Sequence, residues 1–409
     1  MKIEKHKILG GKVYVYRREK SRYWYCSSFL DGRNWRTSTK EESLSRAKDF
    51  AEDWYLTLRG KKLIGQLRVG GHLIVDVPEA QGAVLELRSL DGSTEPAGVT
   101  LEVATEEDLE RLCISGEDDV STQFIQAMSE GNVVVLRVAR KAKPSQPVLL
   151  NIECSGEVCA LHLLVDVGEL AEVELITRLS GDAEWTGFLR QGTFGNASHV
   201  NDVVINHLGE GRLLRTDGIH LGRDAQVRGG TVGSGASRCK ADLRYTMDHA
   251  GASLKVNGSI LSLDGMHNDH HVEILHLAPE TYSRLDWHSA CSGKSRTIGT
   301  GMLRIEAGAK GADAGQLFHN LLLSKDAEAD SIPELEVSEN DVVGCGHGTA
   351  NGPVDDDQMF YLSTRGFDDA EARDVLVAAF LNATLTEMGS EVLHEHLLKT
   401  LTRDLAVEL

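Results

Sequence analysis

The 409-residue sequence has few of the features that mark membrane or secreted proteins. No stretch approaches the roughly 18 apolar residues that a helix needs to span a bilayer. The first residues (MKIEK) carry no apolar segment of the kind found in a secretory signal. These two absences predict a cytoplasmic protein that does not bind a membrane.

Cysteine and proline are also scarce. The seven cysteines are odd in number and scattered, which argues against a disulfide framework and fits a reducing compartment. Proline occurs only seven times in the whole chain. Because proline lacks a backbone N–H, its near absence between residues 148 and 354 is expected where most N–H groups form sheet hydrogen bonds.

Charge is distributed unevenly along the chain. The formal net charge is −19, but residues 1–66 hold 16 Lys/Arg and 8 Asp/Glu, a balance of +8. The remaining residues hold 27 Lys/Arg and 54 Asp/Glu, a balance of −27. A body this acidic repels nucleic acid, whereas the basic N-terminal segment can attract it.

The basic segment 1–66 is predicted to form a three-stranded sheet followed by a helix. Aromatic and β-branched residues cluster at 12–16 and 23–30, and Asp31-Gly32 predicts a hairpin turn into 34–38. Apolar residues then recur at helical spacing from 44 to 58.

This segment resembles the small N-terminal arm-binding domain of phage-type tyrosine recombinases. The residues that carry the resemblance are 11–18 (GKVYVYRR), Trp24, Asp31-Gly32 and 46–55 (RAKDFAEDWY). The resemblance implies contact with DNA, although no recombinase catalytic domain follows. The alternative is a small satellite domain whose aromatic side chains form its core. The candidate DNA-binding residues are Arg17, Arg18, Arg22, Arg33 and Arg36.

Residues 67–147 are a mixed α/β region, and the pattern changes at 148. From 148 to 364, short runs of alternating apolar residues are separated by corners of Gly or Asp followed by small residues, as at 224–225, 251–252 and 308–309. Many short strands could form a sandwich, a propeller or a β-helix. Hairpin dipeptides are rare here, and the repeated corner chemistry favours a β-helix. The predicted fold class is therefore mainly β.

Residues 365–409 are predicted to form a helical domain. Asp368 and Asp369 can cap a helix that runs to Met388, and Ser390 can cap a second helix with a stripe of leucines four residues apart. Two amphipathic helices at the end of a β body could dock another protein. They could equally pack on the body or on each other.

Four short segments near the end of the chain carry a family resemblance. In order they are 319–324 (HNLLLS), 333–336 (PELE), 345–349 (CGHGT) and 357–366 (DQMFYLSTRG). They resemble the SufB/SufD family, whose members have N-L-L-L-S, P-x-L-E-[IV], C-S-H-G-A and F-Y-L-x-x-R-G segments in that order. The likeness continues more weakly back to about residue 120, and so covers roughly 290 residues.

This resemblance implies a right-handed parallel β-helix with a C-terminal helical domain that binds the ABC-type ATPase SufC. It implies a scaffold, not an enzyme, that pairs with a SufB-type homologue or with a second copy. A transient iron–sulfur cluster would be built near that interface, with no permanent cofactor, and ATP would be bound by the partner. SufB proteins carry a cysteine in the segment matching 317–319, and its absence here places the chain nearer to SufD. The partner-binding candidates are Arg365, Gly366, Phe367, Ala372, Val375 and Phe380.

The Cys345-x-His347 pair is the first candidate for cluster assembly. Two residues apart on an extended segment, the side chains point the same way, and both thiolate and imidazole ligate iron. The pair could also be an ordinary strand end. The resemblance favours function, because the matching SufD histidine is implicated in cluster building. Glu334 and Glu336 also share a face and could supply oxygen ligands or accept protons, although a solvated carboxylate ladder would look the same.

Other histidines do not predict a dedicated metal site. In the cluster 267–276, His270 and His276 share one face of a strand while His271 points to the other. His319 could act as a ligand, but a structural role is the simpler interpretation.

Two other functions compete with the scaffold. One is a DNA-associated protein whose N-terminal segment does the binding and whose β-helix is an oligomerisation body. The other is a carbohydrate-active β-helix enzyme, which needs clustered carboxylates that the sequence does not show.

Overall fold

The computed structural model describes residues 5–8, 12–18, 21–30, 33–48, 50–51, 72–74, 82–92, 96–113, 120–129, 133–403 and 405. The chain divides into two compact units, Met1–Val69 and Gly70–Leu409. Within the described ranges, no helix is both long and apolar enough to cross a bilayer.

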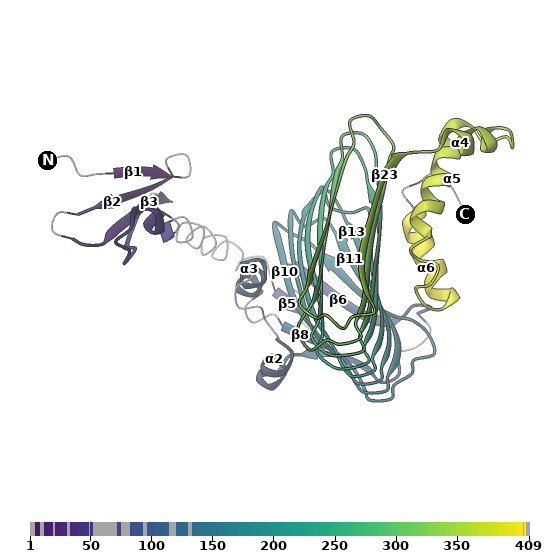
Figure 1. The fold of residues 1–409 in the computed structure, drawn as a ribbon, viewed down its shortest axis with the longest axis horizontal. Coiled ribbons are helices and arrows are strands. Elements are labelled where there is room, and N and C mark those ends of the chain that lie inside the picture. The colour runs from purple at the N-terminus through teal and green to yellow at the C-terminus, as the bar shows by residue number, and fades with distance from the viewer. Residues whose placement is uncertain are drawn as a thin grey trace. The chain divides into compact units, whose positions relative to one another are not determined.

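The first unit contains an antiparallel sheet with strand order β1-β2-β3-β4. Its strands are β1 (Lys5–Ile8), β2 (Val13–Arg17), β3 (Trp24–Leu30) and β4 (Arg33–Ser38) (Figure 1). The predicted three-stranded sheet is therefore wrong by one strand, β1. That strand (KHKI) has few β-branched or aromatic residues, so its sequence alone does not predict a strand. Its Lys5 ammonium lies 3.9 Å from the ring centre of Tyr14 on β2.

One small apolar core lies beneath this sheet. Residues 44–48 and 50–51 are helical, and the rest of the predicted helix to 58 lies outside the described residues. Two alanines of the helix pack against the sheet, so aromatic and aliphatic residues together form the core. Its buried members are Val13, Val15, Trp24, Cys26, Ala47 and Ala51.

The second unit begins with a mixed α/β region that leads into the β-helix. Its elements are β5 (His72–Ile74), β6 (Gly82–Ser89), β7 (Val99–Val103), α2 (Glu106–Leu112), α3 (Val120–Met128) and β8 (Val133–Val138). Strand β6 pairs antiparallel with β9, and β7 pairs antiparallel with β8. Two reversed strands therefore cover the first coil of the β-helix.

From β9 onward the chain coils into a parallel β-helix of roughly eight turns, and each turn adds one strand to each of two sheets (Figure 1). This confirms the predicted fold. The strands are β9 (Val148–Cys154), β10 (Val158–Val167), β11 (Glu172–Gly181), β12 (Trp185–Phe194), β13 (His199–Leu208), β14 (Arg212–Leu221), β15 (Gln226–Gly233), β16 (Arg238–Met247), β17 (Ser253–Ser262), β18 (His267–His276), β19 (Tyr282–Cys291), β20 (Arg296–Ile305), β21 (Asp313–Leu322), β22 (Glu328–Val337) and β23 (Gly344–Pro353).

Small corner residues allow successive coils to stack closely. The predicted corners at Asp224 and Gly251 do separate strands, and both have a left-handed backbone, with φ of 57° and 75°. A Cβ atom on Gly251 would lie 2.2 Å from a carboxylate oxygen of Asp224 in the preceding coil. Both the backbone conformation and the neighbouring Asp224 side chain therefore favour glycine at this corner.

The interior of the β-helix is mostly apolar, but it encloses a network of buried charges. Arg190 donates to both carboxylate oxygens of Asp202, at 2.8 and 2.6 Å. Asp217 lies 3.1 Å from Arg190 and accepts two bonds from Arg215, at 2.9 and 2.6 Å. None of these four side chains is more than 3% exposed. Charges so deeply buried persist only when they are paired, and here two cations face two anions.

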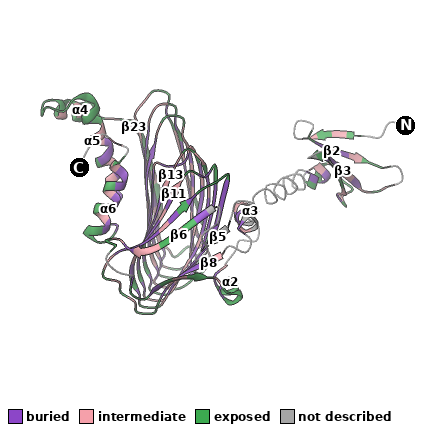
Figure 2. Ribbon diagram, turned by 180° about the vertical axis from the view of Figure 1, so that it is seen from behind, coloured by how far each residue is buried: buried purple, intermediate pink, exposed green. Residues whose placement is uncertain are grey.

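Three helices follow β23: α4 (Asp356–Ser363), α5 (Asp369–Asn382) and α6 (Glu391–Thr402). Asp368 and Ser390 cap α5 and α6 as predicted. Helix α4 lies inside the range predicted as β core, because Asp355 caps it directly after β23. Figure 2 shows buried faces on α5 and α6 and mostly exposed residues on α4.

Helices α5 and α6 pack on the outer face of the sheet formed by the odd-numbered strands. The leucine stripe of α6 contacts this face, so the alternative in which the helices pack on the β body is confirmed. The buried residues that α5, α6 and the turn between them contribute to this interface are Val377, Leu381, Leu385, Met388, Leu393, Leu397 and Leu401. Helix α5 ends earlier than predicted, because Ser259 and Asn257 of β17 donate hydrogen bonds to the carbonyls of Leu381 and Thr384.

Candidate functional site

The last coil of the β-helix carries the four cluster-assembly candidates. Strands β22 and β23 are the final strands of their two sheets, and their outer edges pair with no other strand among the described residues. The coil thus leaves backbone N–H and C=O groups and part of the β-helix interior uncovered. In the previous coil Leu303 and Ile305 are fully buried, whereas their neighbours Leu335 and Val337 are 37% and 43% exposed.

Cys345 and His347 face the interior of the β-helix at this open end. Their register neighbours in β21, Ala314 and Gln316, are buried, and Cys345 packs against the interior apolar cluster. His347 is exposed because no further coil covers it. The amide oxygen of Gln316 is buried and accepts no hydrogen bond within the described part of the chain. The end of the interior therefore combines a thiol, an imidazole and an unused amide oxygen.

Burial raises the pKa of the Cys345 thiol, and the nearby Asp313 carboxylate raises it further. The thiol is therefore protonated at neutral pH. Iron binding at Cys345 would have to displace that proton, so ligation by this residue is favoured at higher pH.

Glu334 and Glu336 point away from Cys345 and His347. They lie on β22, and their register neighbours Met302 and Arg304 are on the outer face of the even-numbered sheet. Arg304 donates to Glu336 at 2.8 Å. The structure therefore separates the two glutamates from the thiol–imidazole pair. The glutamates lie on the outer face of the even-numbered sheet, whereas Cys345 and His347 lie on the inner face of the odd-numbered sheet.

The partner-binding candidates divide into an exposed group and a buried group. Arg365, Gly366 and Phe367 are exposed in the turn between α4 and α5. Ala372 is fully buried and Val375 is half-buried in α5. Phe380 stacks on His288 of β19, with 4.5 Å between ring centres, so it contacts the β-helix. The exposed group can meet another protein directly, whereas the buried group positions the helix.

The DNA-binding candidates Arg17, Arg18, Arg22 and Arg36 are exposed in the first unit. The guanidinium carbon of Arg18 lies 4.1 Å from the ring centre of Tyr25, and that of Arg22 lies 4.6 Å from Tyr23. The side chain of Arg33 lies outside the described residues. These stacked arginines form a basic and aromatic surface.

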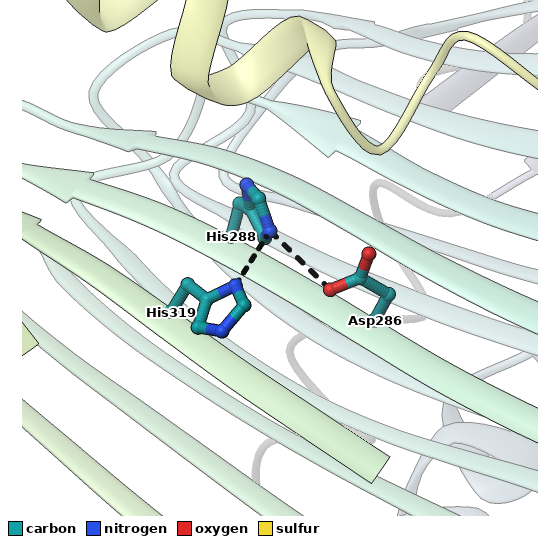
Figure 3. A group of neighbouring side chains, drawn as sticks. All are labelled: Asp286, His288 and His319. Carbon is teal, nitrogen blue, oxygen red and sulfur yellow. Dashed lines mark hydrogen bonds and ion pairs between the residues drawn. The ribbon is translucent and has the colours of Figure 1, made fainter. Parts of the chain in front are cut away.

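A cluster that the sequence does not single out lies on the outer wall beneath α5 (Figure 3). Asp286 and His288 are on β19, and His319 is on β21. His288 Nε2 lies 3.0 Å from His319 Nδ1 and 3.3 Å from Asp286 Oδ1. Burial lowers the pKa of His319, and its neighbour His288 lowers it further. One coil separates the two histidines, and this spacing is the signal by which a known β-helix register would have revealed them.

The histidines of β18 are divided as predicted. His270 and His276 face the interior, where burial lowers the pKa of His270 to about 3 and that of His276 to about 4. His271 faces outward, 3.6 Å from Asp242.

Comparison with known proteins supports the family resemblance noted in the sequence. The model of the family "SUF system FeS cluster assembly, SufBD core domain" matches residues 150–380. An iron-sulfur cluster assembly SufBD family protein of Mycobacterium tuberculosis is 28% identical over 307 residues, which are 71% of this chain and 77% of that protein. The iron-sulfur cluster assembly protein SufD of Escherichia coli is 25% identical over 315 residues, 73% of this chain and 72% of its own length.

Proposed function

The chain belongs to the SufBD family of iron–sulfur cluster assembly proteins, because the family model matches more than half of it, and from this we propose a more specific role. It is a cytoplasmic scaffold subunit, without catalytic turnover of its own. It pairs through its open β-helix end with a SufB-type homologue or a second copy, and it docks a SufC-type ATPase. A transient iron–sulfur cluster is its cargo at the interface.

The position of Cys345 and His347 carries this proposal. An iron–sulfur cluster needs about four protein ligands, commonly thiolates and in some cases imidazoles. The last coil offers one thiol and one imidazole on the interior side of an uncovered end. The remaining ligands must come from another chain or from the sulfur donor. A site of this kind is completed only by a partner, as expected for a cluster that is built and passed on.

The open end has the chemistry of a pairing surface. Its unpaired strand edges can extend a sheet into a second protein by main-chain hydrogen bonds. Exposed Leu335 and Val337 add apolar area that a second β-helix would cover. The partner is accordingly a protein with the same kind of β-helix end.

The exposed α4 segment supports the docking of an ATPase. Phe360 and Tyr361 are 71% and 56% exposed, and Phe367 in the following turn is 39% exposed. Exposed aromatic residues beside an arginine are typical of the centre of a protein interface. ATP is bound by that partner and not by this chain.

The site is tested by replacing His347 and Cys345 with alanine. The chain is co-expressed with a SufB-type and a SufC-type protein, and iron and sulfide are measured in the purified complex. We expect each variant to lower cluster content about tenfold while the complex still forms, as for loss of a metal-binding group. The matched control is His249→Ala, an exposed histidine remote from the last coil in sequence. Full cluster content in His347→Ala would refute the site.

The docking surface is tested separately. Phe360→Asp together with Phe367→Asp should abolish co-purification with the SufC-type protein and leave pairing with the SufB-type protein intact. Val392→Asp, also an exposed apolar residue but on α6, is the control and should retain both partners. Retention of the ATPase by the double variant would place its docking surface elsewhere.

A second candidate function is DNA binding by the first unit, favoured by the exposed and stacked arginines of β2 and the following turn. The full chain should shift duplex DNA at low salt, and the shift should weaken steeply as salt rises. Replacing Arg17, Arg18 and Arg22 with alanine should reduce that salt dependence. No shift at low salt would exclude this function.

A further inference from the structure

The cluster of Asp286, His288 and His319 has the chemistry of a metal site on the outer wall of the β-helix (Figure 3). Two imidazoles and one carboxylate are a common ligand set for divalent first-row transition metals, especially iron and zinc. The three residues come from two adjacent parallel strands, so the rigid wall fixes their spacing. The cluster is on the opposite side of the wall from the interior and is separate from Cys345 and His347.

Two of the three separations between ligand atoms fit ligands of one ion. Ligand atoms bound at about 2.1 Å in tetrahedral or octahedral geometry lie roughly 3.0–3.4 Å apart. His288 Nε2 is 3.0 Å from His319 Nδ1 and 3.3 Å from Asp286 Oδ1. Ligand-capable atoms of all three residues lie within 4.8 Å of one another.

The hydrogen bonds of His288 set its tautomer. Its Nδ1 lies 2.8 Å from the carbonyl oxygen of Phe380, which can only accept, so Nδ1 carries the proton. In the neutral ring, Nε2 then presents a lone pair toward the other two residues. Metal-bound histidines usually donate their second N–H to a carbonyl or carboxylate in this way.

A carboxylate oxygen without a donor points at the same place. Asp286 Oδ1 is buried and accepts no hydrogen bond from any residue in the described ranges. A lone pair on His288 and a carboxylate oxygen 3.3 Å away repel each other unless Nε2 is protonated or a cation lies between them. A buried acceptor without a donor is unfavourable, and a bound ion would relieve this.

The surrounding structure also favours a cation. Phe380 is in the last turn of α5, where the helix dipole is negative. Its ring stacks on His288 and limits the motion of the imidazole. In β23 the register neighbour of His319 is Ala350, which is small and exposed, so one side of the cluster remains open to solvent.

We propose that Asp286, His288 and His319 form a binding site for one divalent first-row transition-metal ion, with Fe²⁺ or Zn²⁺ as the fitting class. The three residues occupy one side of the ion and leave the other positions to water or an exogenous ligand. Through His288, the ion would also hold the end of α5 against the β-helix.

The test uses the full chain, stripped of metal with a chelator and titrated with Co²⁺, whose visible absorption reports its coordination, and with Zn²⁺ in competition with an indicator. The wild-type chain should take up one equivalent. Asp286→Asn and His319→Asn should weaken that uptake at least tenfold while the circular dichroism spectrum stays unchanged. Zn²⁺ should raise the unfolding temperature of the wild type and not that of His319→Asn.

Two controls separate this site from other binding. His220→Ala removes an imidazole 3.1 Å from Asp248, a simple surface pair, and should leave metal uptake unchanged. His249→Ala, which removes an exposed imidazole 3.8 Å from Asp248, should also leave it unchanged. No stoichiometric uptake by the wild type, or uptake that survives both Asp286→Asn and His319→Asn, overturns the proposal.

Discussion

Replacing Asp217 with asparagine should destabilise the β-helix far more than an equivalent change at the surface. Asp217 is fully buried and balances Arg190 and Arg215, at 3.1 and 2.6 Å. Burial alone would raise the pKa of Asp217, but the two guanidinium groups outweigh it and hold the pKa below its usual range. The carboxylate is therefore charged at neutral pH, and its removal leaves two buried cations facing the single anion Asp202.

The expected loss follows from that imbalance. Removing one partner of a buried ion pair costs about 3–5 kcal/mol, because the remaining charge is neither solvated nor paired. At about 2 °C per kcal/mol, the low end for large domains, the unfolding temperature should fall by roughly 6–10 °C. Thermal unfolding followed by circular dichroism measures the change, and urea unfolding checks it.

Asp330→Asn is the matched control. It makes the same isosteric change to a carboxylate 2.7 Å from Arg296, but that pair is 45–46% exposed. Solvent screens such pairs, so this variant should unfold close to the wild type. If Asp217→Asn is no more destabilising than Asp330→Asn, the buried network is not what holds the middle coils together.

Three further predictions concern the body of the protein. Burial lowers the pKa of His276 to about 4, so below pH 6.5 the unfolded chain binds a proton that the folded chain does not. The free energy of unfolding should therefore fall as the pH is lowered from 6.5 to 4. Urea unfolding of His276→Gln should show a weaker pH dependence than that of the wild type. Leu397→Ala removes a fully buried contact of α6 and should cost about 2–5 kcal/mol, seen as faster proteolysis of the C-terminal helices, whereas Leu398→Ala at a half-buried position should cost less. Gly251→Ala should lower the unfolding temperature more than Gly265→Ala, because both have a left-handed backbone but only Gly251 would clash with the preceding coil.

The β-helix could be predicted from the sequence because its corners and strands have local signals. Gly and Asp at the corners reflect a backbone conformation, and Asp368 and Ser390 are helix caps with a chemistry of their own. The shared direction of Cys345 and His347 follows from the alternation of a strand. Each of these properties depends on a few neighbouring residues.

The contacts between residues of different coils depend on the register of the coils, which cannot be predicted from the sequence. Val158 stacks on Trp185, 27 positions later, whereas Tyr282 stacks on Asp313, 31 positions later. Because coil length varies, the meeting of His288 with His319 could not be computed from spacing alone. For the same reason, the ion pairing of Arg190 and the outward position of Glu336 could not be predicted. The early end of α5 likewise depends on donors from distant β17.

The two ends of the β-helix differ, and this asymmetry limits how the protein can assemble. At the start, β6 and β7 run against the direction of the coils, and β5 extends the sheet beyond β6. At the other end, β22 and β23 are edge strands, and no reversed strand lies beyond them in the described chain. A stack of repeats in which both ends can pair with another chain polymerises head to tail, whereas a stack with one pairing end stops at two chains. A contact made through the final coil alone would therefore join two chains and leave no end of the same kind for a third.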